Sequence, residues 1–326
     1  MNGTFESFDL LSATYKTVDN VLINVDVLAP KNLTAGLHPC IFRFHGGGFV
    51  SGSTLHPRFF PQWVLELSLI VGAIIVLPNY RLLPESNVPD MLADLDDFWI
   101  WTRNDLDSLL ATASTTGLRA DLSRILTVGE SAGGYLSVQF AMNHVHEGVR
   151  ACIAECAFLD ATPVNTTAFQ PHIGPPVIAD PTLSRFNIID TLIANGTFTD
   201  YFGNDPDVYP IKRLKAGAKM PPTFLIHGLD DTVVPDSHSI RFAETVRKVD
   251  PSAKVHLELQ PGEHLMDIPL RLGHAWLIRG ALRAFTEALH DVDTVDMVAG
   301  TLSLIWPILT KTDRLFGLKI GAGGGG

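Results

Sequence analysis

Short apolar runs and longer amphipathic segments alternate along most of the chain. Apolar runs that are typical of buried parallel strands lie at 39–45, 73–80, 124–131, 150–159, 221–228 and 254–262. Apolar residues recur at helical spacing in the segments 88–106, 132–145, 236–249 and 271–290. Residues 20–30 alternate and end in proline, which indicates an early antiparallel strand. This order predicts an α/β fold with a mostly parallel central sheet and helices on both faces.

One region interrupts the alternation of strands and helices. Residues from about 160 to 216 are rich in proline, asparagine, glycine and phenylalanine and contain no clear strand. A long insertion of this kind is usually functional, so we expect a cap over a pocket, joined by residues 1–20. With 326 residues, of which 46% are hydrophobic, the chain is expected to form a single domain over residues 1–290.

Residues 291–326 are predicted to form an apolar extension followed by a disordered glycine-rich tail. The apolar run Met297–Leu309 is too short to cross a bilayer and contains a proline. It is expected to pack on its own sheet; the alternatives are contact with a membrane surface or burial against a second copy in a homodimer. The N-terminus lacks the basic start and long apolar core of a secretory signal, which predicts a cytoplasmic protein.

The charge and the cysteine pattern exclude several classes of function. The formal net charge of −11 disfavours a nucleic-acid partner, which would normally meet a basic face. The three cysteines do not form a disulfide framework or a CxxC motif. No histidine or cysteine cluster has the spacing of metal ligands, so neither a metal nor a cofactor is expected.

The stretch "VGESAGG", residues 128–134, matches the G-x-S-x-G pattern around Ser131. It follows a predicted strand and opens a predicted helix, which is the context that a nucleophile elbow requires. The turn is so tight that residues two before and two after the serine must be small, hence Gly129 and Gly133. The alternative, an incidental serine in a glycine-rich turn, is the less favoured interpretation.

A serine nucleophile needs a base and an orienting carboxylate, which in this fold follow it in the order Asp or Glu, then His. Asp230 and Asp231 both follow the strand at 221–228, and His264 lies in the loop after the last strand. His264 is therefore the expected base, whereas His256 within a strand and His227 at a strand end are expected to be structural.

Five motifs occur in order: "HGGGF" at 45–49, "NYRLLPE" at 79–85, "GESAGG" at 129–134, "HGLDDTVVP" at 227–235 and "GEH" at 262–264. Together they resemble the hormone-sensitive-lipase branch of the α/β-hydrolase esterases, over about residues 21–288. The resemblance also extends, more loosely, to hydrolases found beside fungal polyketide pathways.

The resemblance implies which residues act. It places the acid at Asp231 rather than Asp230 and the base at His264, and it assigns the oxyanion hole to the backbone N–H groups of Gly47, Gly48 and Ala132. The "YRxxPE" segment is expected to be structural. The family commonly has aspartate before the nucleophile, whereas this chain has Glu130; some esterases share a glutamate at this position.

His45 directly precedes three glycines and is the other candidate base. It comes before the nucleophile by a whole strand and helix, which is the wrong place in the topology. We therefore expect His45 to fix the glycine loop through hydrogen bonds, and the glycines to allow close approach of the backbone to a substrate oxygen.

The function expected from these residues is hydrolysis of small or medium apolar carboxylic esters through an acyl-enzyme. A second hypothesis keeps the triad but acts on a bulky natural-product ester, lactone or thioester, by hydrolysis, acyl transfer or cyclisation. Its pocket would be shaped by six apolar residues: Phe158, Phe169, Ile173, Phe186, Phe198 and Phe202. The third hypothesis is a receptor for a small molecule without catalysis.

Overall fold

The computed structural model describes residues 3–161, 174–274, 276–277, 280–281 and 284. Eight strands form one sheet in the order β1-β2-β4-β3-β5-β6-β7-β8. β1 pairs antiparallel with β2, and β2 pairs antiparallel with β4, whereas all other neighbours are parallel. The strands are β1 (Phe8–Val18), β2 (Val21–Pro30), β3 (Gly36–Phe44), β4 (Ile74–Pro78), β5 (Leu118–Glu130), β6 (Val149–Glu155), β7 (Thr223–Gly228) and β8 (Val255–Gln260).

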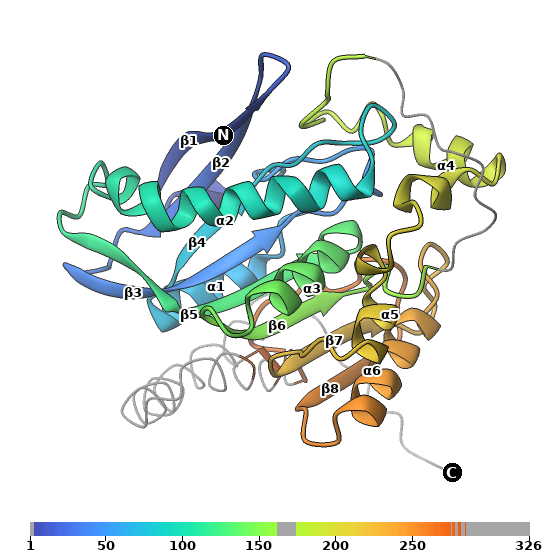
Figure 1. Ribbon diagram of the computed structural model, residues 1–326. Coiled ribbons are helices and arrows are strands. Elements are labelled where there is room, and N and C mark those ends of the chain that lie inside the picture. Colours follow the sequence, from blue (N-terminus) through green and yellow to red (C-terminus); the bar gives the residue numbers. More distant parts are fainter. Residues whose placement is uncertain (1–2, 162–173, 275, 278–279, 282–283, 285–326) are drawn as a thin grey trace, which may run out of the picture.

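Helices cover both faces of the sheet, with α2 and α3 lying across one face in Figure 1. The α-helices are α1 (Gln62–Val71), α2 (Val88–Leu110), α3 (Ala132–His144), α4 (Asn187–Ala194), α5 (Pro210–Lys215) and α6 (Ser237–Val249). The short 3-10 helices are η1 (Gly3–Phe5), η2 (Phe198–Phe202) and η3 (Pro206–Val208). The mostly parallel sheet with helices on two faces confirms the predicted fold class.

The two faces of the sheet form two hydrophobic cores, because successive side chains of a strand point in opposite directions. In β3, Cys40 and Phe42 face the core under α2 and α3, whereas Ile41 faces the core under α1. Residues after β8 complete the second core, since the described residues Leu277 and Ala281 are helical and fully buried. Buried strands of this kind are expected to read as continuous apolar runs.

The structure confirms the predicted strands and helices in the described residues, but it corrects the N-terminus. The sequence predicts that residues 1–20 join a cap, whereas in the structure residues 8–18 form the edge strand β1, paired along its length with β2. Its side chains alternate between more and less exposed positions, as in a strand with one covered face. The sequence pattern also did not indicate α1, a short helix that covers the second core.

The insertion between β6 and β7, described over residues 174–216, carries α4, η2, η3 and α5. Among these described residues no strand of the main sheet occurs, and a single isolated bridge joins Asp180 to Gly52. We call residues 174–216 the insertion segment. The predicted C-terminal extension, residues 291–326, and the apolar residues Phe169 and Ile173 lie outside the described part of the chain.

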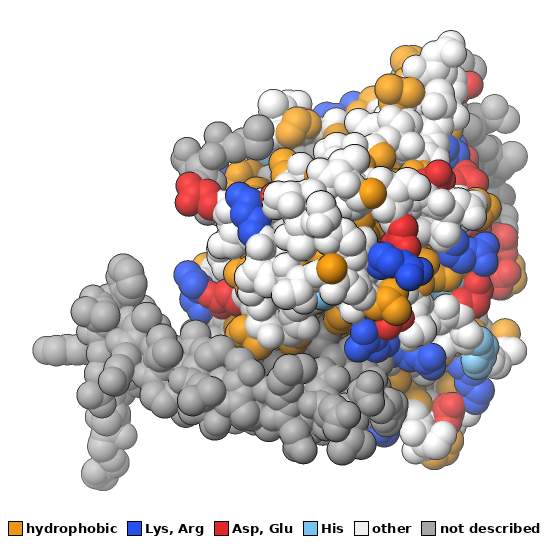
Figure 2. All heavy atoms as spheres, turned by 90° about the vertical axis from the view of Figure 1, so that its left-hand side faces the viewer, with side chains coloured by type: hydrophobic (Ala, Val, Ile, Leu, Met, Phe, Trp, Pro, Cys, Tyr) orange, Lys and Arg blue, Asp and Glu red, His pale blue; other side chains and the backbone are white. Residues whose placement is uncertain are grey.

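None of the helices in the described part of the chain is long and apolar enough to cross a membrane. Acidic and basic side chains are interspersed on the face shown in Figure 2.

Phe98 on α2 belongs to the larger core and is fully buried. Its ring packs edge-on against Phe42 and Tyr15, with centroids 5.3 and 5.9 Å away. Phe98→Ala is expected to lower the free energy of unfolding by about 3–5 kcal/mol, because the transfer and cavity terms add. Urea unfolding measures this. Ile100→Ala, at a position 49% exposed on the same helix, is the control and should change stability little.

Candidate active site

Ser131 lies at the sharp turn between β5 and α3. Its backbone has φ 55° and ψ −117°, a conformation that is strained for a residue with a side chain. A Cβ atom on Gly129 would lie 2.1 Å from the carbonyl oxygen of Gly133, and one on Gly133 would lie 2.0 Å from that of Phe44. Side chains at these two positions are therefore excluded, and the serine is held at the end of the sheet.

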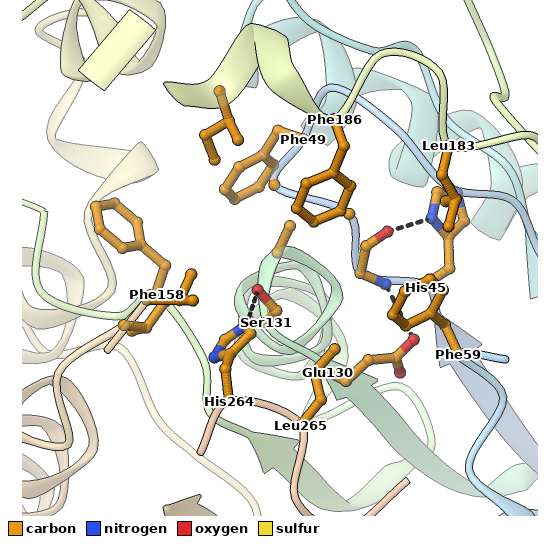
Figure 3. A pocket seen from close by; sticks show the side chains of 18 of the residues that line it. His45, Phe49, Phe59, Glu130, Ser131, Phe158, Leu183, Phe186, His264 and Leu265 are labelled. Carbon is orange, nitrogen blue, oxygen red and sulfur yellow. Dashed lines mark hydrogen bonds between the residues drawn. The ribbon is translucent and has the colours of Figure 1, made fainter. Parts of the chain in front are cut away.

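Ser131, His264 and Asp231 form one continuous series of hydrogen bonds (Figure 3). The Nε2 atom of His264 lies 3.0 Å from Oγ of Ser131, and its Nδ1 atom lies 2.7 Å from Oδ2 of Asp231. An ionised carboxylate only accepts, so Nδ1 of His264 carries the proton and Nε2 is free to accept from the serine hydroxyl. This is the arrangement in which an imidazole can act as a general base.

Asp231 is held as an ion by several donors. Burial opposes its ionisation, but hydrogen bonds from His227 and His264 and from the backbone N–H of Val234 lower the pKa of this carboxyl well below its usual value. The neighbouring Asp230 instead accepts from the backbone N–H of Gly262, at 2.9 Å. The structure thus places Asp231, and not Asp230, beside His264.

Ser131 lines a cavity of about 490 Å³, which is within the usual size range of small-molecule sites. Most of its wall is apolar, and three of the six apolar residues that were predicted to shape it line it: Phe158, Phe186 and Phe198. Figure 3 shows Phe158 on one side of Ser131 and His45 with Phe59 on the other. Phe202 is fully buried and packs against Phe49 and Tyr135 instead.

Residues 41–264 match a family model described as the alpha/beta hydrolase fold. The chain belongs to the alpha/beta hydrolase family. The predicted family is therefore confirmed, and the match covers the glycine loop, the nucleophile turn and the histidine loop of this hydrolase.

Individual proteins similar to this chain include a carboxylesterase, a synthase and an esterase structure of the same fold. The hydrolase is 30% identical over 308 residues to "Probable carboxylesterase M8" of Phoma sp., covering 86% of this chain and 96% of that one. It is 23% identical to a non-reducing polyketide synthase, pkbA of Emericella nidulans, over 79% of this chain but only 13% of the synthase. Among solved structures, Thermogutta terrifontis esterase 2 phosphonylated by sarin aligns with a TM-score of 0.59 at 19% identity, covering 93% and 96% of the two chains.

His45 orients the first peptide group of the glycine loop of the hydrolase. Its Nδ1 atom lies 2.7 Å from the carbonyl oxygen of Gly46, and since a carbonyl only accepts, Nδ1 is the donor. In a planar trans peptide the C=O and N–H groups point in opposite directions, so the N–H of Gly47 points away from the His45 ring. The expectation that His45 fixes the loop through hydrogen bonds is confirmed.

The next peptide group is oriented by the turn that follows. The carbonyl oxygen of Gly47 accepts from the backbone N–H groups of Val50 and Ser51, at 3.2 and 3.0 Å. The N–H of Gly48, on the same peptide, therefore points away from this turn. A Cβ on Gly47 would lie 2.1 Å from the carbonyl oxygen of Ser51, so glycine is required there.

Glu130, the residue before the nucleophile, has a role that the sequence did not indicate. Its Oε1 atom accepts from the backbone N–H of Gly46 at 3.0 Å and from the guanidinium of Arg43. Burial raises the pKa of Glu130 to about 7, although the charge of Arg43 opposes this shift. Glu130 thus joins the nucleophile turn to the glycine loop, and only the family position of an acidic residue could have pointed to it.

The structural roles expected for other motif residues are confirmed. His227 contacts Ser239 and the carbonyl oxygen of Val234, both at 2.8 Å, and His256 stacks on Phe224 within the β7–β8 region. In the "YRxxPE" segment, the Tyr80 hydroxyl donates to the carbonyl oxygen of His45 at 2.6 Å. Arg81 pairs with Asp94 and Asp90 of α2.

One group of described residues has the donor types of a metal site, because ligand atoms of Cys156, Asp231 and His264 lie within 4.8 Å of one another. Asp231 and His264 are already bonded to each other. Burial, and then the nearby carboxyl of Asp267, raise the pKa of the Cys156 thiol, which disfavours the thiolate that a metal requires. The absence of a metal and of a cofactor stays a prediction.

His45 is 2% exposed, and burial lowers its pKa to about 3. The unfolded chain therefore binds a proton at His45 below pH 6.5 that the folded chain does not, so this residue makes the folded state less stable as the pH falls. As the pH falls from 7 to 5, this residue lowers the free energy of unfolding of the wild type by about 1–2 kcal/mol. The glutamine in His45→Gln still offers a hydrogen-bond donor but does not titrate. The difference in unfolding free energy between wild type and variant should therefore become smaller by about 1–2 kcal/mol when the pH is lowered from 7 to 5. A difference that stays constant with pH would contradict the assignment.

Proposed function

We propose that this chain is a serine hydrolase that cleaves carboxylic esters of small or medium apolar substrates through an acyl-enzyme. The single observation that carries the proposal is the continuous series of hydrogen bonds from Asp231 through His264 to Ser131, which lines an apolar cavity. The similarity to a protein named as a carboxylesterase, over 86% of this chain, supports the same reaction.

The first half of the reaction transfers the acyl group to the serine. Oγ of Ser131 attacks the carbonyl carbon while its proton moves to Nε2 of His264. Asp231, ionised, stabilises the imidazolium that forms. When the tetrahedral intermediate collapses, the carbon–oxygen bond to the alcohol breaks and His264 gives its proton to the leaving oxygen. A water molecule then repeats the sequence on the acyl-serine and releases the acid.

The tetrahedral intermediate carries a negative oxygen that needs donors already in place. We assign these donors to the backbone N–H groups of Gly47, Gly48 and Ala132. The first two belong to peptides whose carbonyl groups are turned to His45 and to the Val50–Ser51 turn. Loss of one such donor typically costs about 10²–10³ in turnover.

The second candidate function is the same chemistry on a bulky natural-product ester, lactone or thioester. The phenylalanine-rich wall of the cavity and the similarity to a segment of a polyketide synthase favour it. A general esterase should turn over p-nitrophenyl acetate and butyrate rapidly. A dedicated pathway enzyme should hydrolyse neither and act on a bulky aromatic ester or thioester.

The cytoplasmic location, the homodimer and the small-molecule ester as sole partner stay predictions.

Ser131→Ala is expected to lower kcat/KM for a short-chain aryl ester by a factor of about 10⁴ or more, because the nucleophile is lost. The folded wild type should also be labelled by a fluorophosphonate probe, and the variant should not. Ser252→Ala, in an exposed turn, is the matched control and should keep both properties. Full esterase activity in Ser131→Ala would refute the nucleophile, and failure of folded wild type to label would favour a non-catalytic receptor.

A further inference from the structure

We propose that Asp180 and Arg185 of the insertion segment are positioning residues that fix the turn after the glycine loop and so aim the N–H of Gly48. The proposal rests on the ester hydrolase function proposed above. Neither residue belongs to any of the five motifs, and both lie more than 120 positions away in the chain from the turn that they contact.

Asp180 joins the insertion segment to the turn by its backbone and its side chain. Its N–H donates to the carbonyl oxygen of Gly52 at 2.7 Å, and its own carbonyl oxygen accepts from the N–H of Gly52 at 3.3 Å. Its Oδ2 atom accepts from the hydroxyl of Ser51 at 2.9 Å. The same carboxylate accepts from Thr182, Ser184 and the backbone N–H of Arg185, which hold it in one orientation.

The site of Asp180 is built for an ionised carboxylate. The residue is only 4% exposed, and Ser51 is fully buried. Burial opposes ionisation, but the hydrogen bonds from the N–H of Arg185 and from three hydroxyl groups lower the pKa of Asp180 to about 2. A buried carboxylate that is fully hydrogen-bonded in this way is a rigid acceptor over the whole neutral range.

Arg185 holds the same turn from a second direction. Its Nε atom donates to the carbonyl oxygen of Val50 at 3.0 Å, and one Nη atom donates to the carbonyl oxygen of Leu83 at 2.8 Å. The same Nη atom pairs with the carboxylate of Glu85, the last residue of the "YRxxPE" segment. A planar guanidinium can satisfy these three acceptors at once because its donors lie in one fixed fork.

The two contacts converge on the residues that orient Gly47. Arg185 holds Val50, Asp180 holds Ser51, and the N–H groups of Val50 and Ser51 are the donors to the carbonyl oxygen of Gly47. Because that carbonyl and the N–H of Gly48 belong to one planar peptide, a rotation of the turn would rotate the N–H of Gly48. The insertion segment is thus linked to the proposed oxyanion donor by two successive sets of hydrogen bonds. The first joins Asp180 and Arg185 to the turn, and the second joins the turn to the carbonyl oxygen of Gly47.

The insertion segment also rests directly on the loop. Ile189 of α4, four residues after Arg185, packs close to Gly48, with its Cδ1 atom 2.6 Å from the position that a Cβ of Gly48 would take. Phe186 and Ile189 line the cavity at the same time. The segment that forms part of the substrate wall is therefore the segment that braces the donor, which predicts an effect on turnover and not on substrate binding alone.

The test compares Asp180→Asn and Arg185→Gln with wild type, using kcat per active site as titrated with a fluorophosphonate. Each variant is expected to lower kcat about 10- to 100-fold, as for partial loss of one oxyanion donor, with KM changed less than threefold. Arg185→Lys, which keeps the charge but not the fork, should restore part of kcat. Asp121→Asn is the matched control, since Asp121 lies near the start of β5 and bonds Ser123 and Arg124 of the same strand.

A second measurement does not depend on activity. Amide hydrogen exchange of residues 47–52 should be faster in Asp180→Asn than in wild type, and unchanged in Asp121→Asn. If Asp180→Asn does not fold, Ser51→Ala replaces it as the test variant, because it removes only the hydrogen bond from Ser51 to Asp180. Its amide exchange over residues 47–52 should also be faster than in wild type, but by a smaller factor. Variants with wild-type kcat per titrated site, an effect on KM alone, or unchanged exchange would overturn the proposal. An inactive wild type would instead refute the hydrolase function itself.

Discussion

A planar trans peptide carries its C=O and N–H groups in opposite directions, and in the glycine loop this constraint connects the scaffold to the chemistry. Gly46 presents its carbonyl to His45, and Gly47 presents its carbonyl to the N–H groups of Val50 and Ser51. The N–H groups of Gly47 and Gly48 are thereby aimed without any side chain of their own. Glycine is needed at Gly47 because a Cβ would collide with the carbonyl oxygen of Ser51, and it is favoured at Gly48 because this residue has a positive φ of 62°.

Buried polar groups around the loop supply the rigidity that this arrangement requires. Neutral His45 stacks on Tyr80 at 4.4 Å, Glu130 pairs with Arg43 and Asp180 accepts from several donors. A buried charge or hydrogen-bonding group is costly when it is left unpaired, so each of these groups favours the one conformation in which its partners are present. The strain at Ser131 is tolerated in the same way, because its backbone N–H donates to the carbonyl oxygen of Glu155 at 2.8 Å.

Much of the fold and the proposed triad could be predicted from the sequence because both leave local patterns. Buried parallel strands appear as apolar runs, and the glycines around Ser131 reflect contacts within one turn. The choice of Asp231 over Asp230 could not be made from position alone and needed the family resemblance. Strand β1 was not predicted from the sequence, because its place in the sheet depends on its pairing with β2. The contacts of Asp180 and Arg185 join residues far apart in the chain, so no local pattern in the sequence could predict them.

We propose that the N–H groups of Gly47 and Gly48, together with that of Ala132, receive the negative oxygen of the intermediate. A crystal structure with a phosphonate bound covalently to Ser131 tests this most directly, since its phosphoryl oxygen stands in for that oxygen. We expect this oxygen to lie about 2.7–3.1 Å from the three backbone nitrogen atoms. A phosphoryl oxygen that points away from the glycine loop, into solvent or toward another donor, would contradict this assignment of the donors.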